Sequence, residues 1–260
     1  MIILLHSSKT MRPPNQGSKT LQKPELLDKA VEISDYLKTL SPKQLATTMH
    51  LSPTLASKTH DLLAGWTAEP SNQRVAIDSF LGDIYSGLQV PDFTDTDRDY
   101  ANQTLRILSG LYGILKPLDG IYPYRLEMGY RLPAKKFANQ YAYWGDSIVK
   151  TLTKDHQIIN LAANEYSKVI TDFVDKSRLI SPSFLTINHK TNQPTFVVVH
   201  AKIARGAFAH WLIKNQIDET KSLEGFGDLG YTYNKHLSSA SSPVFVCDDF
   251  GGLGLSLRLK

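Results

Sequence analysis

The pattern of apolar and polar positions predicts a first half rich in helices. The run Met1-Ile2-Ile3-Leu4-Leu5-His6 is apolar throughout, which is typical of a buried strand. Apolar residues then recur at helical spacing from Pro24 to Leu40. Ser41-Pro42 and Ser52-Pro53 each place a capping hydroxyl before a proline suited to the first helical turn. We therefore expect a long helix over 24–40 and two short helices after it.

The middle of the chain is harder to assign from its pattern. Residues 75–88 mix apolar and turn signals, and we interpret them as a helix or a strand that breaks at Gly82. Acidic residues after Thr94 favour a helix start, because they lie at the positive end of the helix dipole. The pattern predicts that this helix runs into Gly110.

The second half contains more β-branched and aromatic residues, which favour strands. We expect helices over 143–153, 164–173 and 201–216, and strands over 158–162, 178–187, 195–200, 231–233 and 243–247. This mixture predicts the α+β (mixed α/β) class. We expect a single large domain over 1–247, with a central mixed sheet and surrounding helices, followed by a loose C-terminal tail over 248–260.

Composition limits the classes of protein that the chain can represent. Its 260 residues are 42% hydrophobic and 21% charged, as in an ordinary globular protein, and no run is long enough for a membrane span. The apolar start is too short for a signal-peptide core. The single cysteine, Cys247, excludes an internal disulfide framework and suits a reducing cytosol, so we expect a cytoplasmic protein. The histidines lack the spacing of a zinc site, and we expect neither a metal nor a cofactor.

Charge alternates sharply along the chain. Residues 105–136 contain six Lys or Arg and two acids, whereas residues 61–104 contain two bases and eight acids. The basic block coincides with a turn-rich segment around Gly110-Leu111-Tyr112-Gly113. A basic block beside exposed backbone N–H groups is a surface that a phosphate backbone can approach.

The Gly110–Gly113 segment has two readings. It could be the hairpin of a helix-hairpin-helix element whose backbone amides contact a phosphate. It could equally be an ordinary helix end, with Gly110 as a left-handed cap. Pro117 fits the first reading poorly, because proline does not suit a helix interior. The residues alone favour the ordinary helix end.

Two further groups of cations are candidates for anion contacts. Lys9 follows the first strand and is flanked by Ser7, Ser8 and Thr10; a lysine there can hold a phosphate or act as an amine nucleophile. An isolated Ser-Lys-Thr is nevertheless more typical of a solvated loop. Lys202 and Arg205 lie on adjacent turns of one predicted helix, where they could bind an anion or only face solvent. The G-x-G-x-x-G match over 225–230 lacks the strand before it and the helix after it, so we discard it.

These stretches resemble the YaaA family of peroxide-stress proteins, from Ile2 to about Phe245. The resemblance is carried by Ser8-Lys9-Thr10, Gly82-Asp83-Ile84-Tyr85-Ser86-Gly87-Leu88, Leu108-Ser109-Gly110-Leu111-Tyr112-Gly113-Ile114-Leu115-Lys116-Pro117-Leu118-Asp119, Tyr124-Arg125-Leu126-Glu127-Met128-Gly129, Trp144-Gly145-Asp146, Asn160-Leu161-Ala162-Ala163-Asn164-Glu165-Tyr166, Lys202-Ile203-Ala204-Arg205-Gly206 and Gly230-Tyr231. The chain departs from the family in one motif: it has His6-Ser7-Ser8 where the family usually has Ser-Pro-Ala before the lysine.

The resemblance implies a bacterial cytoplasmic protein that limits oxidative damage to DNA and protein by lowering free intracellular iron. It also implies a single-domain α/β fold with a positively charged cleft, a helix-hairpin-helix element and DNA binding. On this basis phosphate contact becomes the preferred reading of the Gly110–Gly113 segment. The chain has no iron site of the His and carboxylate kind in its sequence pattern, so we expect an indirect effect on iron. The predicted DNA-binding residues are Lys9, Arg106, Gly110, Tyr112, Gly113, Lys116, Arg125, Arg131, Lys202 and Arg205.

Two classes of function follow. The favoured one is a monomeric DNA-binding stress protein without turnover, which binds duplex or distorted DNA of any sequence. The alternative is a lyase- or glycosylase-like enzyme acting on nucleic acid, with Lys9 as amine nucleophile or phosphate ligand. Its acid or base would be Glu127, Asp146 or Glu165. In either case we expect Lys9, Arg125, Glu127 and Lys202 to converge in one cleft.

Overall fold

A mixed sheet forms the centre of the computed structural model, which describes residues 1–14 and 22–252. Its strand order is β6-β5-β1-β8-β9; β5, β1, β8 and β9 are parallel, and β6 is antiparallel to β5. The predicted first strand is confirmed, and its apolar side chains are at most 3% exposed. The strands of this sheet are β1 (Ile2–His6), β5 (Leu105–Ser109), β6 (Gly113–Leu115), β8 (Ile158–Asn160) and β9 (Leu179–Ile180).

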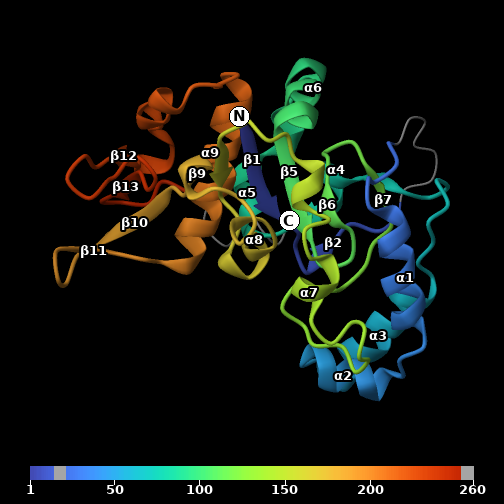
Figure 1. The fold of residues 1–260 in the computed structure, drawn as a ribbon. Coiled ribbons are helices and arrows are strands. Elements are labelled where there is room, and N and C mark those ends of the chain that lie inside the picture. The colour runs from blue at the N-terminus through green and yellow to red at the C-terminus, as the bar shows by residue number, and fades with distance from the viewer. Residues whose placement is uncertain (15–21, 253–260) are drawn as a thin grey trace.

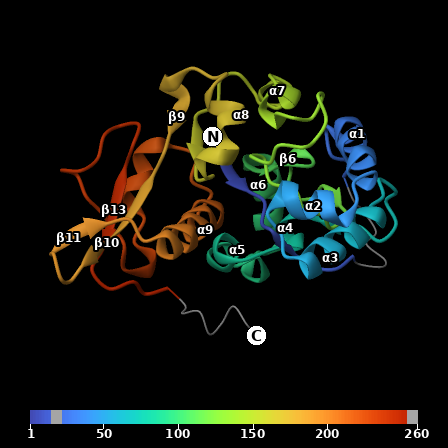
Figure 2. The same cartoon turned by 90° about the horizontal axis from the view of Figure 1, so that it is seen from below.

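A second sheet lies at one end of the molecule, and the first three helices lie at the other (Figure 2). The strand order of this second sheet is β11-β10-β13-β12, and β10 and β13 are parallel. Stacked and edge-on aromatic rings around Phe184 and Phe245 form its core. The strands are β10 (Ser183–Asn188), β11 (Gln193–Thr195), β12 (Thr232–Tyr233) and β13 (Val244–Cys247), and two smaller pairs are β2 (Thr10–Met11) with β4 (Phe80–Leu81) and β3 (Arg74–Val75) with β7 (Gly120–Ile121).

Helices surround the central sheet (Figure 1). Both predicted Ser-Pro starts are confirmed: Ser41 accepts from the Gln44 N–H in a capping box, and Ser52 accepts from the Leu55 N–H. Within the described ranges, no helix has the length and apolar content needed to cross a membrane. The helices are α1 (Leu27–Lys38), α2 (Pro42–Met49), α3 (Pro53–Ala64), α4 (Ala76–Ser79), α5 (Asp83–Leu88), α6 (Asp95–Thr104), α7 (Gln140–Trp144), α8 (Asn164–Thr171) and α9 (Val198–Lys214).

The α+β class is confirmed, but the helix predicted to reach Gly110 is wrong in its second half. Helix α6 ends at Thr104, and the apolar residues that follow form β5, which pairs with β1. A strand that is buried on both faces is apolar at nearly every position, so its pattern resembles that of a buried helix. Gly110 to Gly113 therefore joins two antiparallel strands, and the helix-hairpin-helix reading is corrected to a β-hairpin.

Three other predicted elements are also corrected. The strand over 195–200 ends at Thr195, and α9 already begins at Val198. The helix over 143–153 stops at Trp144, because Gly145 takes a positive φ of 49° there. The strand over 178–187 is two strands, β9 and β10, which belong to different sheets.

Helix α9 crosses α5 at very short range. A Cβ atom on Gly206 would lie 1.8 Å from the carbonyl oxygen of Ile84, and one on Gly87 would lie 2.0 Å from that of Ile203. Only glycine at both positions allows the backbones to approach so closely. On its other side α9 packs against β10. The crossing fixes the position of α5 relative to α9, and the starts of both helices line the cleft described below.

The first residues of the predicted tail pack against the start of α9 and the residue before β12. The Phe250 ring stacks on His200 with 4.0 Å between centroids and meets Tyr231 edge-on. Residues 253–260 of that tail lie outside the described part of the chain, and its boundary at 247 stays a prediction.

Candidate functional site

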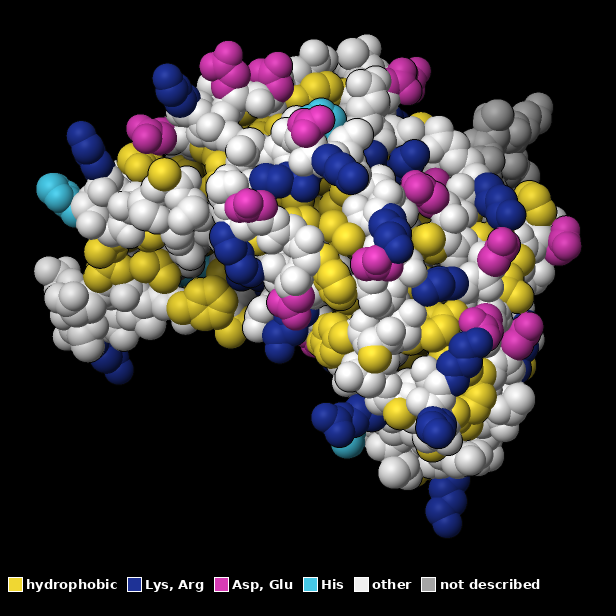
Figure 3. Space-filling model, in the orientation of Figure 1, with side chains coloured by type: hydrophobic (Ala, Val, Ile, Leu, Met, Phe, Trp, Pro, Cys, Tyr) yellow, Lys and Arg dark blue, Asp and Glu magenta, His cyan; other side chains and the backbone are white. Residues whose placement is uncertain are grey.

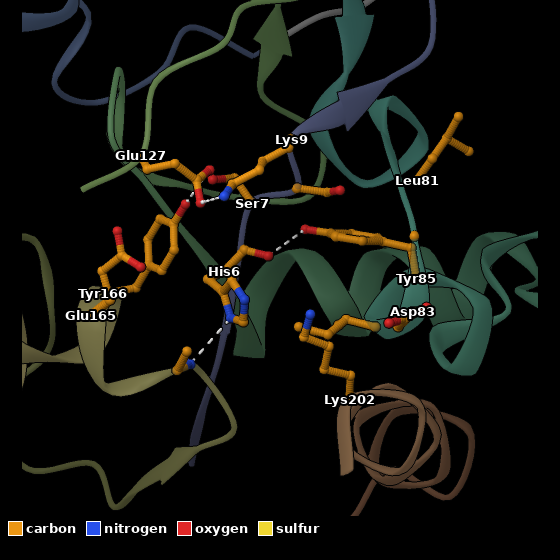
Figure 4. A pocket seen from close by; sticks show the side chains of 14 residues that line it. His6, Ser7, Lys9, Leu81, Asp83, Tyr85, Glu127, Glu165, Tyr166 and Lys202 are labelled. Atoms are coloured by element: carbon orange, nitrogen blue, oxygen red, sulfur yellow. Dashed lines mark hydrogen bonds and ion pairs between the residues drawn. The ribbon is translucent and has the colours of Figure 1, made fainter. Parts of the chain in front are cut away.

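A cleft of about 390 Å³ opens at the carboxyl end of β1 (Figure 4). Its walls come from the loop after β1, the start of α5, the segment around Glu127, the start of α8 and the first turns of α9. Strands β1 and β8 are parallel neighbours, so the loop after β1 and the start of α8 meet at the same sheet edge. This is the edge at which open α/β sheets usually bind ligands.

Three side chains form a connected polar chain in this cleft. The Lys9 Nζ lies 3.4 Å from Glu127 Oε2, and the Tyr166 hydroxyl donates to Glu127 Oε1 over 2.9 Å. Burial and the nearby Glu127 charge raise the pKa of Tyr166, so its hydroxyl remains a donor. Glu127 is buried, whereas the Lys9 side chain is 52% exposed. The ammonium of Lys9 is therefore accessible to a ligand while Glu127 is held in place.

Gly110 has a structural reason to be glycine. A Cβ atom there would lie 2.4 Å from the Leu126 carbonyl oxygen, so only glycine lets the 126–127 backbone cross the hairpin. The Gln140 Nε2 donates to the Glu127 carbonyl oxygen over 2.8 Å and fixes the same segment from the other side. The hairpin glycine thus positions Glu127.

The hairpin itself does not reach the surface. Gly110 and Gly113 are buried, and Tyr112 is 0% exposed. The Tyr112 hydroxyl accepts from Trp66 Nε1 over 2.9 Å and from the Tyr122 N–H over 3.1 Å. These three residues offer no surface to a phosphate, so we remove them from the proposed DNA contacts.

His6 is a cleft residue that sequence reasoning did not select, as are Tyr166 and Tyr85. Its ring stacks on Tyr166 with 4.7 Å between centroids, and its Nδ1 accepts from the Ala163 N–H over 3.2 Å. Burial, followed by the charges of Arg205 and Lys202, lowers the pKa of His6 to about 3. The imidazole is therefore neutral at physiological pH, and its proton sits on Nε2. The only signal in the sequence was the departure from the family motif at this position.

The cations of α9 flank His6. Lys202 extends into the cleft opposite the imidazole (Figure 4). Arg205 lies one turn further along and is partly buried, and this burial lowers the pKa of its guanidinium. Glu165, at the start of α8, accepts from the Gly129 N–H through Oε1 over 2.9 Å. The cleft thus holds charges of both signs.

Arg125 lies behind the Lys9 loop instead of lining the cleft. Its Nη1 donates to the Lys9 carbonyl oxygen over 3.3 Å. Its Nε is buried and has no hydrogen-bond partner among the described residues. Of the four residues expected to converge, Lys9, Glu127 and Lys202 line the cleft, and Arg125 supports it from the side.

The remaining predicted residues lie elsewhere. Asp146 pairs with Lys150 on the surface, with 2.7 Å between Oδ2 and Nζ. The partly buried Arg106 donates to its neighbouring Asn102 and Leu105 carbonyls. Lys116 is partly buried, and its N–H donates to Asp119 over 2.7 Å. Arg131 is exposed, next to Tyr130, which lies near the Lys9 and Arg125 charges. In residues 1–14 and 22–252, no three His, Cys, Asp or Glu side chains are grouped as a metal site.

Comparison with known proteins places the chain in a family. The family described as peroxide stress protein YaaA matches residues 1–237. A UPF0246 protein of Salinispora tropica is 56% identical over 258 residues, which cover 99% of this chain and 98% of the relative. UPF0246 proteins of Marinomonas sp. and Shewanella pealeana are 40% and 36% identical over 95% and 96% of this chain, and over 96% and 100% of their own lengths. The chain therefore belongs to the YaaA family of peroxide stress proteins.

Proposed function

We propose that this peroxide stress protein works in the cytoplasm as a monomer that binds DNA of any sequence across the cleft at the end of β1, and so limits iron-dependent damage. The observation that carries the proposal is the meeting of cations from distant segments at one opening. Lys9 comes from the loop after β1, and Lys202 comes from α9. Arg131 is exposed and follows Tyr130, which lies near the Lys9 charge.

The distribution of charge on the surface favours contact with a few phosphates over contact with many successive phosphates of the DNA backbone. Figure 3 shows Lys and Arg side chains interspersed with Asp and Glu on the face that it presents. Three phosphate contacts would make the observed affinity fall about 40-fold between 50 and 200 mM salt, because each neutralised phosphate releases counterions. The backbone contacts carry no sequence information, so binding should tolerate any sequence.

Fluorescence anisotropy with two labelled duplexes of unrelated sequence tests the proposal. Lys9→Ala, Lys202→Ala and Arg131→Ala should each weaken binding to both duplexes and reduce the salt slope by about 1. Lys154→Ala is the matched control, because this exposed lysine precedes β8 and lies at the opposite, amino edge of the parallel sheet. The absence of binding at low salt, or an equal loss in the control, would overturn the proposal.

The Lys9–Glu127 contact also bears on the alternative of an enzyme acting on nucleic acid. An ammonium held against a carboxylate can bind a phosphate, but it is not a nucleophile. The geometry therefore favours Lys9 as a ligand. Borohydride treatment of the protein with DNA containing an abasic site distinguishes the two roles: a covalent adduct that disappears in Lys9→Ala would establish the lyase, and its absence supports the binding role.

A further inference from the structure

We infer that the cleft takes a single nucleotide turned out of the DNA base stack, with its phosphate against His6 and Lys202 and its base edge toward Glu127 and Glu165. This inference rests on the proposed function and names what enters the site. A DNA duplex is too wide to enter the cleft. The cleft volume of about 390 Å³ equals that of a cube with edges of about 7 Å, and a duplex is wider than its major groove, which alone measures about 12 Å. The same volume is within the usual range for small-ligand pockets.

One corner of the cleft is built for an anion. The Nδ1 of His6 accepts a hydrogen bond from the Ala163 N–H, so the ring proton is on Nε2. This Nε2–H can donate to a ligand, because the His6 ring lines the cleft. Lys202 and Arg205 act on the same imidazole through their charges. Asp83 lines the cleft as well, so this corner also holds a negative charge. A phosphate can accept from the neutral His6 and pair with Lys202, as anions do with charge-assisted donors.

The opposite side of the cleft accepts hydrogen bonds. Glu127 accepts from Tyr166 through Oε1 and pairs with Lys9 through Oε2, and Glu165 accepts from the Gly129 N–H through Oε1. An ionised carboxylate has about four acceptor positions, so both retain capacity for a ligand. Adenine, cytosine and guanine carry exocyclic amino groups that can donate there, whereas thymine has none. The cleft should therefore prefer the first three bases to thymine.

Apolar and aromatic side chains also line the cleft. Leu81, Ile84 and Tyr85 belong to this lining, and the Tyr85 hydroxyl donates to the His6 carbonyl oxygen over 3.1 Å. Enzymes and binders that turn out a base stack it on such side chains and read its edge by hydrogen bonds. The energy for unstacking is smallest at a mismatch, so mismatched DNA should occupy the cleft most readily.

Fluorescence of 2-aminopurine tests the inference, because this adenine analogue brightens when it leaves the stack. A duplex carrying it at a mismatch should brighten several-fold on binding, and Lys202→Gln should reduce this increase more than it reduces affinity. Lys154→Ala should behave as the wild type. Normal DNA affinity with unchanged fluorescence would overturn the inference and leave the proposed function intact.

A second measurement separates failure of the inference from failure of DNA binding. The His6 ring resonances should shift in NMR spectra on titration with deoxyadenosine monophosphate, and less with thymidine monophosphate. Unchanged His6 resonances with both nucleotides would overturn the inference. If the His6 resonances shift with the mononucleotide but the protein does not bind duplex DNA, the proposed function is overturned and the nucleotide site is supported.

Discussion

Replacing His6 by asparagine should make the protein less sensitive to acid. In the wild type, burial and the charges of Arg205 and Lys202 hold the pKa of His6 near 3. In the unfolded chain the pKa returns to about 6.5. Between these two values the unfolded chain binds a proton that the folded protein does not, so the free energy of unfolding falls as the pH is lowered from about 6.5 to about 3.

The size of this effect follows from the pKa difference. At pH 5 the solution is about 1.5 units below the pKa of the unfolded histidine, and each unit corresponds to about 1.4 kcal/mol. Lowering the pH from 7.5 to 5 should therefore cost the wild type about 2 kcal/mol through His6 alone. His6 is 9% exposed, so solvent screening reduces this value little.

Urea unfolding of both proteins at pH 7.5 and pH 5, followed by tryptophan fluorescence, measures the effect. Asparagine keeps an oxygen that can accept from the Ala163 N–H, and it removes the titrating group. Asp119 changes stability in the opposite sense, because burial raises its pKa to about 6, but it is present in both proteins and cancels in the comparison. Equal losses of stability in wild type and variant would refute the reasoning.

Other perturbations test different parts of the structure. Gly206→Ala should lower the free energy of unfolding by about 3 kcal/mol, because the new Cβ would meet the Ile84 carbonyl at the α5–α9 crossing, while Gly227→Ala, with nothing within 4 Å, is the control in thermal melts. Glu127→Gln should change stability by less than about 1 kcal/mol, because its partner Lys9 is exposed. The same variant should tighten DNA binding in anisotropy assays, since it removes a negative charge from the cleft; weaker binding would contradict this. Deletion of the gene should sensitise cells to peroxide, and an iron chelator should rescue them; unchanged survival would remove this reading.

Local signals in the sequence were reliable where the neighbours along the chain decide the structure. The two Ser-Pro starts specify helix ends through a capping hydroxyl and a fixed proline φ, and both were predicted correctly. The rule that ligands gather at the carboxyl end of a first parallel strand pointed to the loop of Lys9. It also contributed to the expected convergence of Lys9, Arg125, Glu127 and Lys202, of which all but Arg125 line the cleft. The strand predicted before Lys202 is helix from Val198 onward.

The errors arose where burial by distant segments decides the structure. Leu105, Ile107 and Leu108 are buried in the central sheet beside β1, and such a run of apolar residues is a pattern that a helix core shares. Gly110 was predicted as a helix cap or a phosphate contact, whereas it lets the backbone at Leu126 and Glu127 pass close to the hairpin, and no local pattern shows that contact.

The amino-acid sequence by itself determined the mixed fold class, the first strand, the capped helices and the family, because these depend on local chemistry and on ordered motifs. Only the tertiary structure decided that the glycine hairpin is buried and that His6 is a neutral donor between Tyr166 and the cations of α9. The hairpin is buried by segments such as those of Trp66 and Leu126, and the groups around His6 lie more than a hundred residues away along the chain. Such contacts leave no periodicity for a sequence pattern to show.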